Sequence, residues 1–178
     1  KMIYRHPHVF GSVQAATTDQ VLDNWETLKR AEKGQETDTD TLKAVARTLP
    51  ALWRAEKIQK KAAKSGFSWP DISGAMDKLS EEQEELRTAV AEQSNIREEL
   101  GDVLFAAVAV ARFAGIDPEE ALQEASDKYI SRFSVMEAQT ARQGRRFADM
   151  TLEELVQAWN RAKETQRNAN VQEDKKHE

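Results

Sequence analysis

Residues 72–114 read ISGAMDKLSEEQEELRTAVAEQSNIREELGDVLFAAVAVARFA, and their apolar side chains recur every three to four positions. This spacing predicts one helix over about residues 72–93 and a second over 96–114, with Ser94 and Asn95 as the break between them. Asn95 and Glu98 are expected to form a capping box at the start of the second helix. The predicted apolar stripes are Ile72, Met76, Leu79, Leu86 and Val90 on the first helix, and Ile96, Leu100, Val103, Ala107, Val110 and Ala114 on the second.

A pair of carboxylates three residues apart lies along the edge of each predicted stripe. The pairs are Glu82 with Glu85 and Glu99 with Asp102, and Lys78 lies one turn before the first pair. On consecutive antiparallel helices the four carboxylates could face one another, and their repulsion would favour a cation between them. Because all the ligands would be oxygen atoms, Mg²⁺ or Mn²⁺ is the expected ion. The spacing also fits ordinary solvated helix edges, so the pattern alone leaves both interpretations open.

The rest of the chain is also predicted to be helical. Further helices are expected over about residues 19–32, 50–64, 118–143 and 152–165, the last of them opened by a capping box of Thr151 and Glu154. Residues 34–40 (GQETDTD) contain no apolar side chain and are expected to form a linker. No segment alternates with the period of a strand, so the predicted fold class is all-α, a helical bundle.

Two later pairs of residues are spaced to meet one ligand. Lys128 and Arg132 lie four residues apart on one predicted helix, where both cations could reach the same anion. Trp159 and Lys163 have the same spacing, which suits a nucleotide base lying above its phosphates. Exposed cations with apolar stems and a tryptophan in the core also explain these residues.

The composition excludes several classes of function. The 178 residues include 26 Lys and Arg, 31 Asp and Glu, and no Cys, which gives a formal net charge of −5. This acidic balance argues against a nucleic-acid partner or an anionic membrane surface, and the lack of Cys removes disulfides and thiolate nucleophiles. No apolar run approaches the ~18 residues of a membrane span. We therefore expect a cytoplasmic protein with neither nucleic acid nor membrane as a partner.

The two acidic segments resemble a known signature. EEQEE (81–85) followed by EELGD (98–102) is similar to the Glu-Glu-x-x-Glu … Glu-x-x-Asp pattern of the MazG-type all-α nucleoside triphosphate pyrophosphohydrolases. RHPHVFG (5–11), LPALWRAEKIQKKAAKSGFSW (49–69), ELGDVLFAAV (99–108) and SDKYISRF (126–133) resemble stretches of the two-domain members. The resemblance implies that residues 1–10 end a preceding MazG-like domain, residues 11–48 form a linker with a helix, and residues 49–166 form the catalytic domain. Residues 167–178 are expected to be a disordered tail because they are almost entirely polar.

The resemblance also implies a site and an activity. It implies Glu82, Glu85, Glu99 and Asp102 as catalytic residues and as ligands of Mg²⁺, with Mn²⁺ as a possible substitute. The implied activity is metal-assisted hydrolysis of ribo- and deoxyribonucleoside triphosphates to the monophosphate and pyrophosphate, in a broad house-cleaning role. A homodimer is implied to complete the helical bundle. The residues implied to contact the nucleotide are Lys78, Glu81, Asn95, Lys128, Arg132, Trp159 and Lys163.

Two alternatives remain beside this activity. One is a relative of narrow specificity, such as a dUTP or phosphoribosyl-ATP hydrolase. The other is a non-catalytic helical interaction module in which the carboxylates are simply solvated. Pyrophosphate release from a panel of nucleotides, with and without Mg²⁺, would separate the three.

Overall fold

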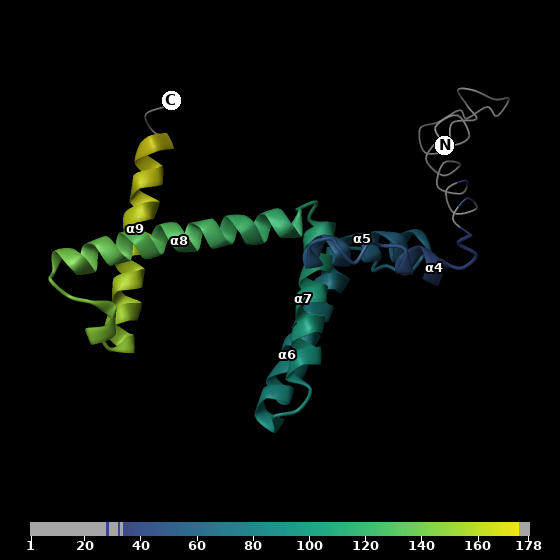
Figure 1. Cartoon of the computed structure of the whole chain (residues 1–178), viewed down its shortest axis with the longest axis horizontal. Coiled ribbons are helices and arrows are strands. Elements are labelled where there is room, and N and C mark those ends of the chain that lie inside the picture. Colours follow the sequence, from purple (N-terminus) through teal and green to yellow (C-terminus); the bar gives the residue numbers. More distant parts are fainter. Residues whose placement is uncertain (1–27, 29–31, 33, 175–178) are drawn as a thin grey trace. The chain divides into compact units, whose positions relative to one another are not determined.

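Every regular element that the structure describes is a helix, which confirms the predicted all-α class (Figure 1). The structure is a computed structural model that describes residues 28, 32 and 34–174. Of the helix predicted over 19–32, only Leu28 and Glu32 are described, and both are helical. The predicted tail of a preceding domain, residues 1–10, lies outside the described residues. The elements are α4 (Asp38–Lys43), α5 (Ala51–Lys64), α6 (Ile72–Glu92), α7 (Ile96–Phe113), α8 (Pro118–Arg142), the 3₁₀ turn η1 (Phe147–Asp149) and α9 (Leu152–Asp174).

The chain divides into two compact units between Pro118 and Glu119. The first unit contains α4 to α7, and the second contains nearly all of α8 together with η1 and α9. The boundary therefore falls inside residues 49–166, which the sequence predicted as one catalytic domain. Across the part of the chain that the structure describes, no helix has both the length and the apolar character needed to cross a bilayer.

The centre of the first unit is a hairpin of α6 and α7, which lie side by side in Figure 1. Asp71 caps α6 by accepting hydrogen bonds from the backbone N–H groups of Ser73 (2.8 Å) and Gly74 (3.4 Å). In the connection between the helices, Gln93 and Asn95 adopt left-handed backbone conformations, with φ of 55° and 50°. This short connection places the two helices next to each other.

The capping box predicted at Asn95 is not formed. The Asn95 side chain makes no capping hydrogen bond, and its backbone carbonyl accepts from the N–H groups of Glu98 (2.9 Å) and Glu99 (3.2 Å). A capping side chain reaches the first turn from an extended backbone, whereas Asn95 is left-handed. The predicted break in the chain is thus correct, but the way in which α7 begins differs from the prediction.

The most buried residues of α6 lie on the edge that carries the carboxylates, whereas the residues of the predicted apolar stripes are half-buried or exposed. Ile72 and Leu100 of those stripes remain 42% and 47% exposed. Small alanine side chains line the buried edge, so the helix backbones can approach closely. Helical spacing shows which residues share a strip along one helix, but it cannot show which strip faces the neighbouring helix. The buried residues are Ala75, Glu82 and Ala89 on α6 and Ala106 and Val108 on α7.

Two side-chain hydrogen bonds tie α5 to the region of α7. Gln59 Nε2 donates to the backbone carbonyl of Phe105 at 2.8 Å. Trp53 Nε1 donates to the carboxylate of Asp117, at 2.8 Å and 2.9 Å from its two oxygens. The preceding helix α4 begins inside the segment predicted as a linker, because Thr37 and Asp40 form a capping box there.

The second unit is built where α9 crosses α8 (Figure 1). Its core consists of Met136 from α8 and Ala158 and Ala162 from α9, with Phe147 of η1 packed against them. The helix α9 continues to Asp174, so residues 167–174 are helical and the predicted disorder does not describe them. The polar composition of this segment is compatible with a helix, because Gln, Arg, Ala and Glu propagate a helix well.

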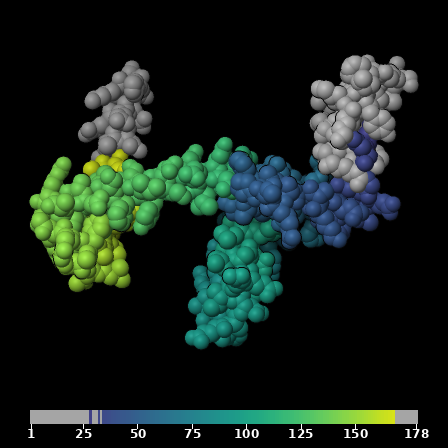
Figure 2. All heavy atoms as spheres, viewed as in Figure 1, coloured from purple at the N-terminus to yellow at the C-terminus, as the bar shows by residue number. Residues whose placement is uncertain are grey.

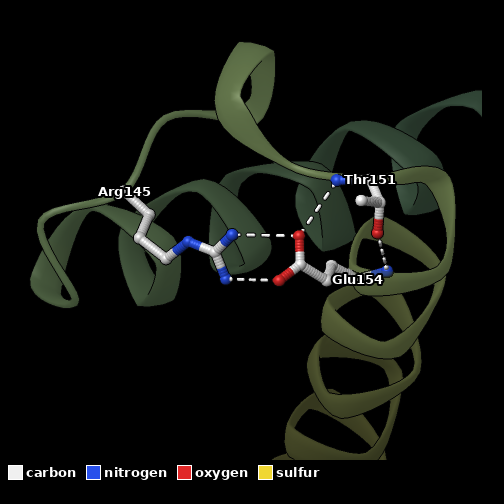
Figure 3. Close-up of polar contacts among 3 residues, drawn as sticks. All are labelled: Arg145, Thr151 and Glu154. Atoms are coloured by element: carbon white, nitrogen blue, oxygen red, sulfur yellow. Dashed lines mark hydrogen bonds and ion pairs between the residues drawn. The ribbon is translucent and has the colours of Figure 1, made fainter.

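The start of α9 carries the predicted capping box, reinforced by an arginine (Figure 3). The N–H of Thr151 donates to the Glu154 carboxylate at 2.9 Å, and the N–H of Glu154 donates to Thr151 Oγ1 at 3.3 Å. Arg145 donates to both carboxylate oxygens of Glu154, each at 2.9 Å. The hydrogen bond from Arg145, followed by those from Thr151, lowers the pKa of Glu154 to about 2.

Candidate functional site

Three carboxylates from α6 and α7 converge in the first unit. One oxygen atom from each of Glu82, Glu99 and Asp102 lies within 4.8 Å of the others. Glu82 is only 7% exposed, Glu99 is half-buried and Asp102 is exposed, so the cluster runs from the interior of the hairpin to its surface. Glu99 and Asp102 share one face of α7 because they are three residues apart. The structure thus brings together three of the four predicted ligands.

Glu85, the fourth predicted ligand, lies beside Glu82 on α6 and is not one of the three converging residues. A hydrogen bond to Glu82 raises the pKa of Glu85 above its ordinary value, and the loss of some hydration and the charge of Glu82 add to this effect. Two carboxylates in contact disfavour a second negative charge. The four acidic side chains therefore form one patch in which Glu82 touches both the cluster and Glu85.

Lys78 supplies a positive charge at the same place. Its Nζ donates to Glu81 at 2.7 Å and forms an ion pair with Glu82 at 2.8 Å. These hydrogen bonds, that to Glu81 first, raise the pKa of Lys78 well above its ordinary value. A buried carboxylate is costly unless it is paired, and Lys78 is the partner of Glu82. Two further predicted site residues, Lys78 and Glu81, are thereby placed at the acidic cluster.

The donor atoms of the cluster suit a hard divalent cation. All of them are carboxylate oxygens, which are the ligands that Mg²⁺, Mn²⁺ and Ca²⁺ prefer. Three carboxylates carry more negative charge than the single ammonium of Lys78 can neutralise. The residues present therefore fit a divalent ion, held by α6 and α7 together.

The remaining predicted residues lie elsewhere. Asn95 is exposed in the connection before α7. In the second unit, Lys128 and Lys163 are exposed, whereas Arg132 is half-buried and its Nε is buried with no hydrogen-bond partner among the described residues. Trp159 packs against the core of the second unit, with its ring 4.8 Å from that of Tyr129.

Sequence reasoning missed a cavity next to the acidic cluster. The cavity has a volume of about 490 Å³, and its lining includes Lys78, Glu82 and Asp102. Gln59 of α5 and Trp69 of the following loop also line it. The sequence does contain one sign of this cavity, the polar Gln59 close to the apolar Ile58 and Ala62 on the same helix. A buried polar side chain among apolar ones is an informative observation because it needs a hydrogen-bond partner.

The fold and the cluster together define an all-α protein with a carboxylate centre suited to a divalent cation. Residues 72–135, which span α6, α7 and the first part of α8, match the model of the MazG nucleotide pyrophosphohydrolase domain. All three converging carboxylates lie inside this match. The chain therefore carries a MazG domain over residues 72–135.

Curated relatives agree with this assignment. The nucleoside triphosphate pyrophosphohydrolase of Escherichia coli (strain K12) is 40% identical over 167 residues, which are 92% of this chain and 64% of that protein. The nucleoside triphosphate pyrophosphohydrolase/pyrophosphatase MazG of Thermotoga maritima is 37% identical over 163 residues, 92% of this chain and 62% of that protein. The uncharacterized protein YabN of Bacillus subtilis (strain 168) is 48% identical over 170 residues, 94% of this chain and 35% of that protein. The chain thus spans less than two thirds of each of these relatives.

Proposed function

We propose that this chain hydrolyses nucleoside triphosphates to the monophosphate and pyrophosphate with the help of Mg²⁺. The observation that carries the proposal is the convergence of Glu82, Glu99 and Asp102 inside a MazG domain. The names of the relatives from Escherichia coli and Thermotoga maritima support the same substrate class. We include both ribo- and deoxyribonucleotides and a broad range of bases.

The acidic patch would hold the metal. Glu82, Glu85, Glu99 and Asp102 are the proposed ligands, with Mn²⁺ as a substitute ion. When bound, a divalent cation would polarise the phosphoryl oxygens and acidify the attacking water. Lys78 adds a fixed positive charge at this place, where it would stabilise negative charge that develops on the phosphates.

Residues of the second unit are proposed to contact the nucleotide as well. Arg132 offers a buried Nε–H that has no partner among the described residues, and a phosphate oxygen would satisfy it. Lys128, one turn earlier on α8, would add a second cation. Trp159 is only half-buried, so part of its indole is available to the nucleotide, and Lys163 lies one turn beyond it on α9.

The exposed apolar face of the α6–α7 hairpin favours a homodimer. In Figure 2, most of the visible surface of this hairpin (teal) is covered by no other segment of the first unit. Large apolar side chains that remain exposed on one hairpin indicate an interaction surface. We infer that a second copy of the chain covers it and completes the helical bundle. The large exposed apolar residues proposed for this face are Ile72, Met76, Val90, Ile96, Leu100 and Leu104.

Pyrophosphate release from the eight common ribo- and deoxyribonucleoside triphosphates, with and without Mg²⁺, tests the activity. Glu82→Gln should lower kcat at least ~10²-fold, because it removes a charge that acts on the transition state. The matched control is Glu84→Gln on the same helix. Glu84 is exposed and pairs with Arg87 at 2.7 Å, so its loss should change kcat less than about twofold.

The outcomes separate the hypotheses. Turnover of several nucleotides that requires Mg²⁺ supports the proposal, and turnover of one nucleotide alone would indicate a narrow specificity. Absence of turnover of every nucleotide, in both Mg²⁺ and Mn²⁺, would reject the proposed hydrolase activity. If Glu84→Gln is as damaging as Glu82→Gln, the assignment of the metal centre fails.

A further inference from the structure

The second unit has a cavity of its own, between the end of α8 and the middle of α9. Its volume is about 490 Å³, which is within the range of small-molecule sites. The three lining residues from each segment are spaced i, i+3 and i+4, which places them on one helical face. Both segments contribute only polar or charged side chains to this cavity. The lining residues are Gln139, Arg142, Gln143, Arg161, Glu164 and Thr165.

Hydrogen bonds tie the two walls of the α8–α9 cavity together. Gln139 Nε2 donates to Thr165 Oγ1 at 3.2 Å, and Thr165 Oγ1 donates to the backbone carbonyl of Arg161 at 2.9 Å. The core residues Met136 and Ala162 lie on the same two helices and are 5% and 0% exposed. The walls are therefore built on packed helices and not on loops, so the cavity presents its side chains at a fixed spacing.

Two arginines of this lining are bound to no other group of the described chain. Neither guanidinium of Arg142 and Arg161 forms an ion pair or a hydrogen bond with the residues that the structure describes. Arg145, only three residues further on, instead has both of its terminal nitrogens on Glu154, each at 2.9 Å. Two like charges from different helices at one cavity favour an anion between them, and a guanidinium binds phosphate oxygens through two parallel hydrogen bonds.

Glu164 adds a condition that this anion must meet. Its carboxylate lines the same cavity and, among the described residues, makes no ion pair with Arg161, although it lies three residues further along α9. An ionised carboxylate only accepts hydrogen bonds. The ligand must therefore bring anionic oxygens for the arginines and an O–H group for Glu164. Hydrogen phosphate brings both at neutral pH, whereas sulfate has the same charge and nearly the same size but no O–H group.

We propose that the α8–α9 cavity binds inorganic phosphate in a protonated form. Arg142 and Arg161 bind its anionic oxygens, and Glu164 accepts a hydrogen bond from its P–OH group. The side-chain amides of Gln139 and Gln143 add neutral donors. Orthophosphate and pyrophosphate share this chemistry. The site uses none of the residues proposed above for the metal or the nucleotide, so it does not depend on the proposed hydrolase activity.

NMR titrations of the full chain, without divalent ions and at constant ionic strength, test this site. Orthophosphate should shift the backbone amides of residues 139–143 and 161–165 along a saturable curve, with a dissociation constant of about 1 mM or below. Sulfate should bind at these amides at least about tenfold more weakly, because Glu164 repels an anion that brings no O–H group. Pyrophosphate is titrated in parallel, and the phosphate that binds more tightly is identified as the ligand of the site.

Variants assign the role of each side chain. Arg142→Gln and Arg161→Gln should each weaken orthophosphate binding at least about tenfold, because each removes a charged donor. Glu164→Gln should bring the affinities for orthophosphate and sulfate to within about threefold, since an amide also donates. The matched control is Arg167→Gln, which is exposed on α9 and outside the lining. It should change binding less than about twofold.

Three results would overturn the proposal. A response to orthophosphate that stays linear up to about 20 mM would mean that there is no site. Equal binding of orthophosphate and sulfate by the parent chain would reject the role of Glu164, and this comparison needs no variant. If Arg161→Gln weakens binding no more than Arg167→Gln does, surface charge and not the cavity attracts the phosphate. None of these measurements requires turnover of a nucleotide, so their outcome is independent of the proposed function.

Discussion

Glu82 shows what helical spacing can and cannot predict about a single residue. Its place beside Ala89 and opposite the carboxylates of α7 follows from the fixed rotation of an α-helix, so the sequence predicted it. The side chains that contact its carboxylate depend on side-chain rotamers, which helical spacing does not predict. In the structure, Lys78 forms an ion pair with Glu82 at 2.8 Å, and Glu85 is a hydrogen-bond partner of Glu82. Gln59 was missed because its burial depends on α7, a helix far along the chain.

A first prediction at this scale concerns Glu154. In a pH titration followed by NMR, its carboxyl group should titrate near 2, because Arg145 and Thr151 stabilise the charged form. A depressed pKa contributes stability that is present above the ordinary value of 4.5 and is lost as the pH falls through about 2. Arg145→Met should bring the midpoint back towards 4.5. A midpoint that Arg145→Met does not change would contradict the assigned cause.

At the scale of the elements, the sequence predicted where the helices lie better than how they pack. Asp71 and the break at residues 94–95 set the bounds of α6 and α7, because capping and chain breaks are local properties. The face along which the two helices meet is determined by tertiary packing, which local sequence signals do not report. The helices pack through small residues at the carboxylate edge and leave larger apolar ones exposed. The length of α9 was underestimated because polar composition was taken as a sign of disorder, although helix propensity does not require burial.

The connection between α6 and α7 gives a prediction about stability. Gln93 ends α6 with φ of 55° and ψ of 36°, a conformation that glycine adopts without the steric cost of a side chain. Gln93→Gly should raise the free energy of unfolding by roughly 0.5–1 kcal/mol. Gln93→Val should lower the free energy of unfolding, because a β-branched residue is strained there. Urea denaturation measures both.

The matched control for this prediction is Gln83→Gly, in the interior of the same helix. There, glycine only adds conformational entropy to the unfolded chain, so the free energy of unfolding should fall by about 1 kcal/mol. Destabilisation of similar size by glycine at both positions would mean that the left-handed turn at Gln93 is absent in solution.

At the scale of the whole molecule, the family resemblance implied one catalytic domain over residues 49–166, and the described chain divides into two compact units after Pro118. The division after Pro118 depends on contacts between distant parts of the chain, and composition does not report these. The acidic cluster lies in the first unit, while Lys128, Arg132, Trp159 and Lys163 lie in the second. Local motifs therefore predicted candidate residues of the site, but they could not show how the two units share these residues.

The prediction at this scale concerns self-association. The parent chain should sediment as a dimer, and Leu100→Glu should raise the dissociation constant of the dimer at least about tenfold, because it places a charge in the proposed apolar interface. Leu152→Glu is the control, since Leu152 is 77% exposed at the start of α9 and is not part of the hairpin. Analytical ultracentrifugation over a range of concentrations measures both variants. The highest concentration in this series should be about 100 μM. A parent chain that is still monomeric there would reject the homodimer.

Lys78 has a consequence for the order in which the protein matures. Because its ammonium already neutralises the most buried carboxylate, the hairpin can close before any ion arrives. Folding and metal loading are then separate events, unlike in small domains that stay unfolded until a metal binds. A newly made chain would then fold in metal-poor surroundings and bind the proposed ion later, and a chelator would remove the proposed activity without unfolding the chain.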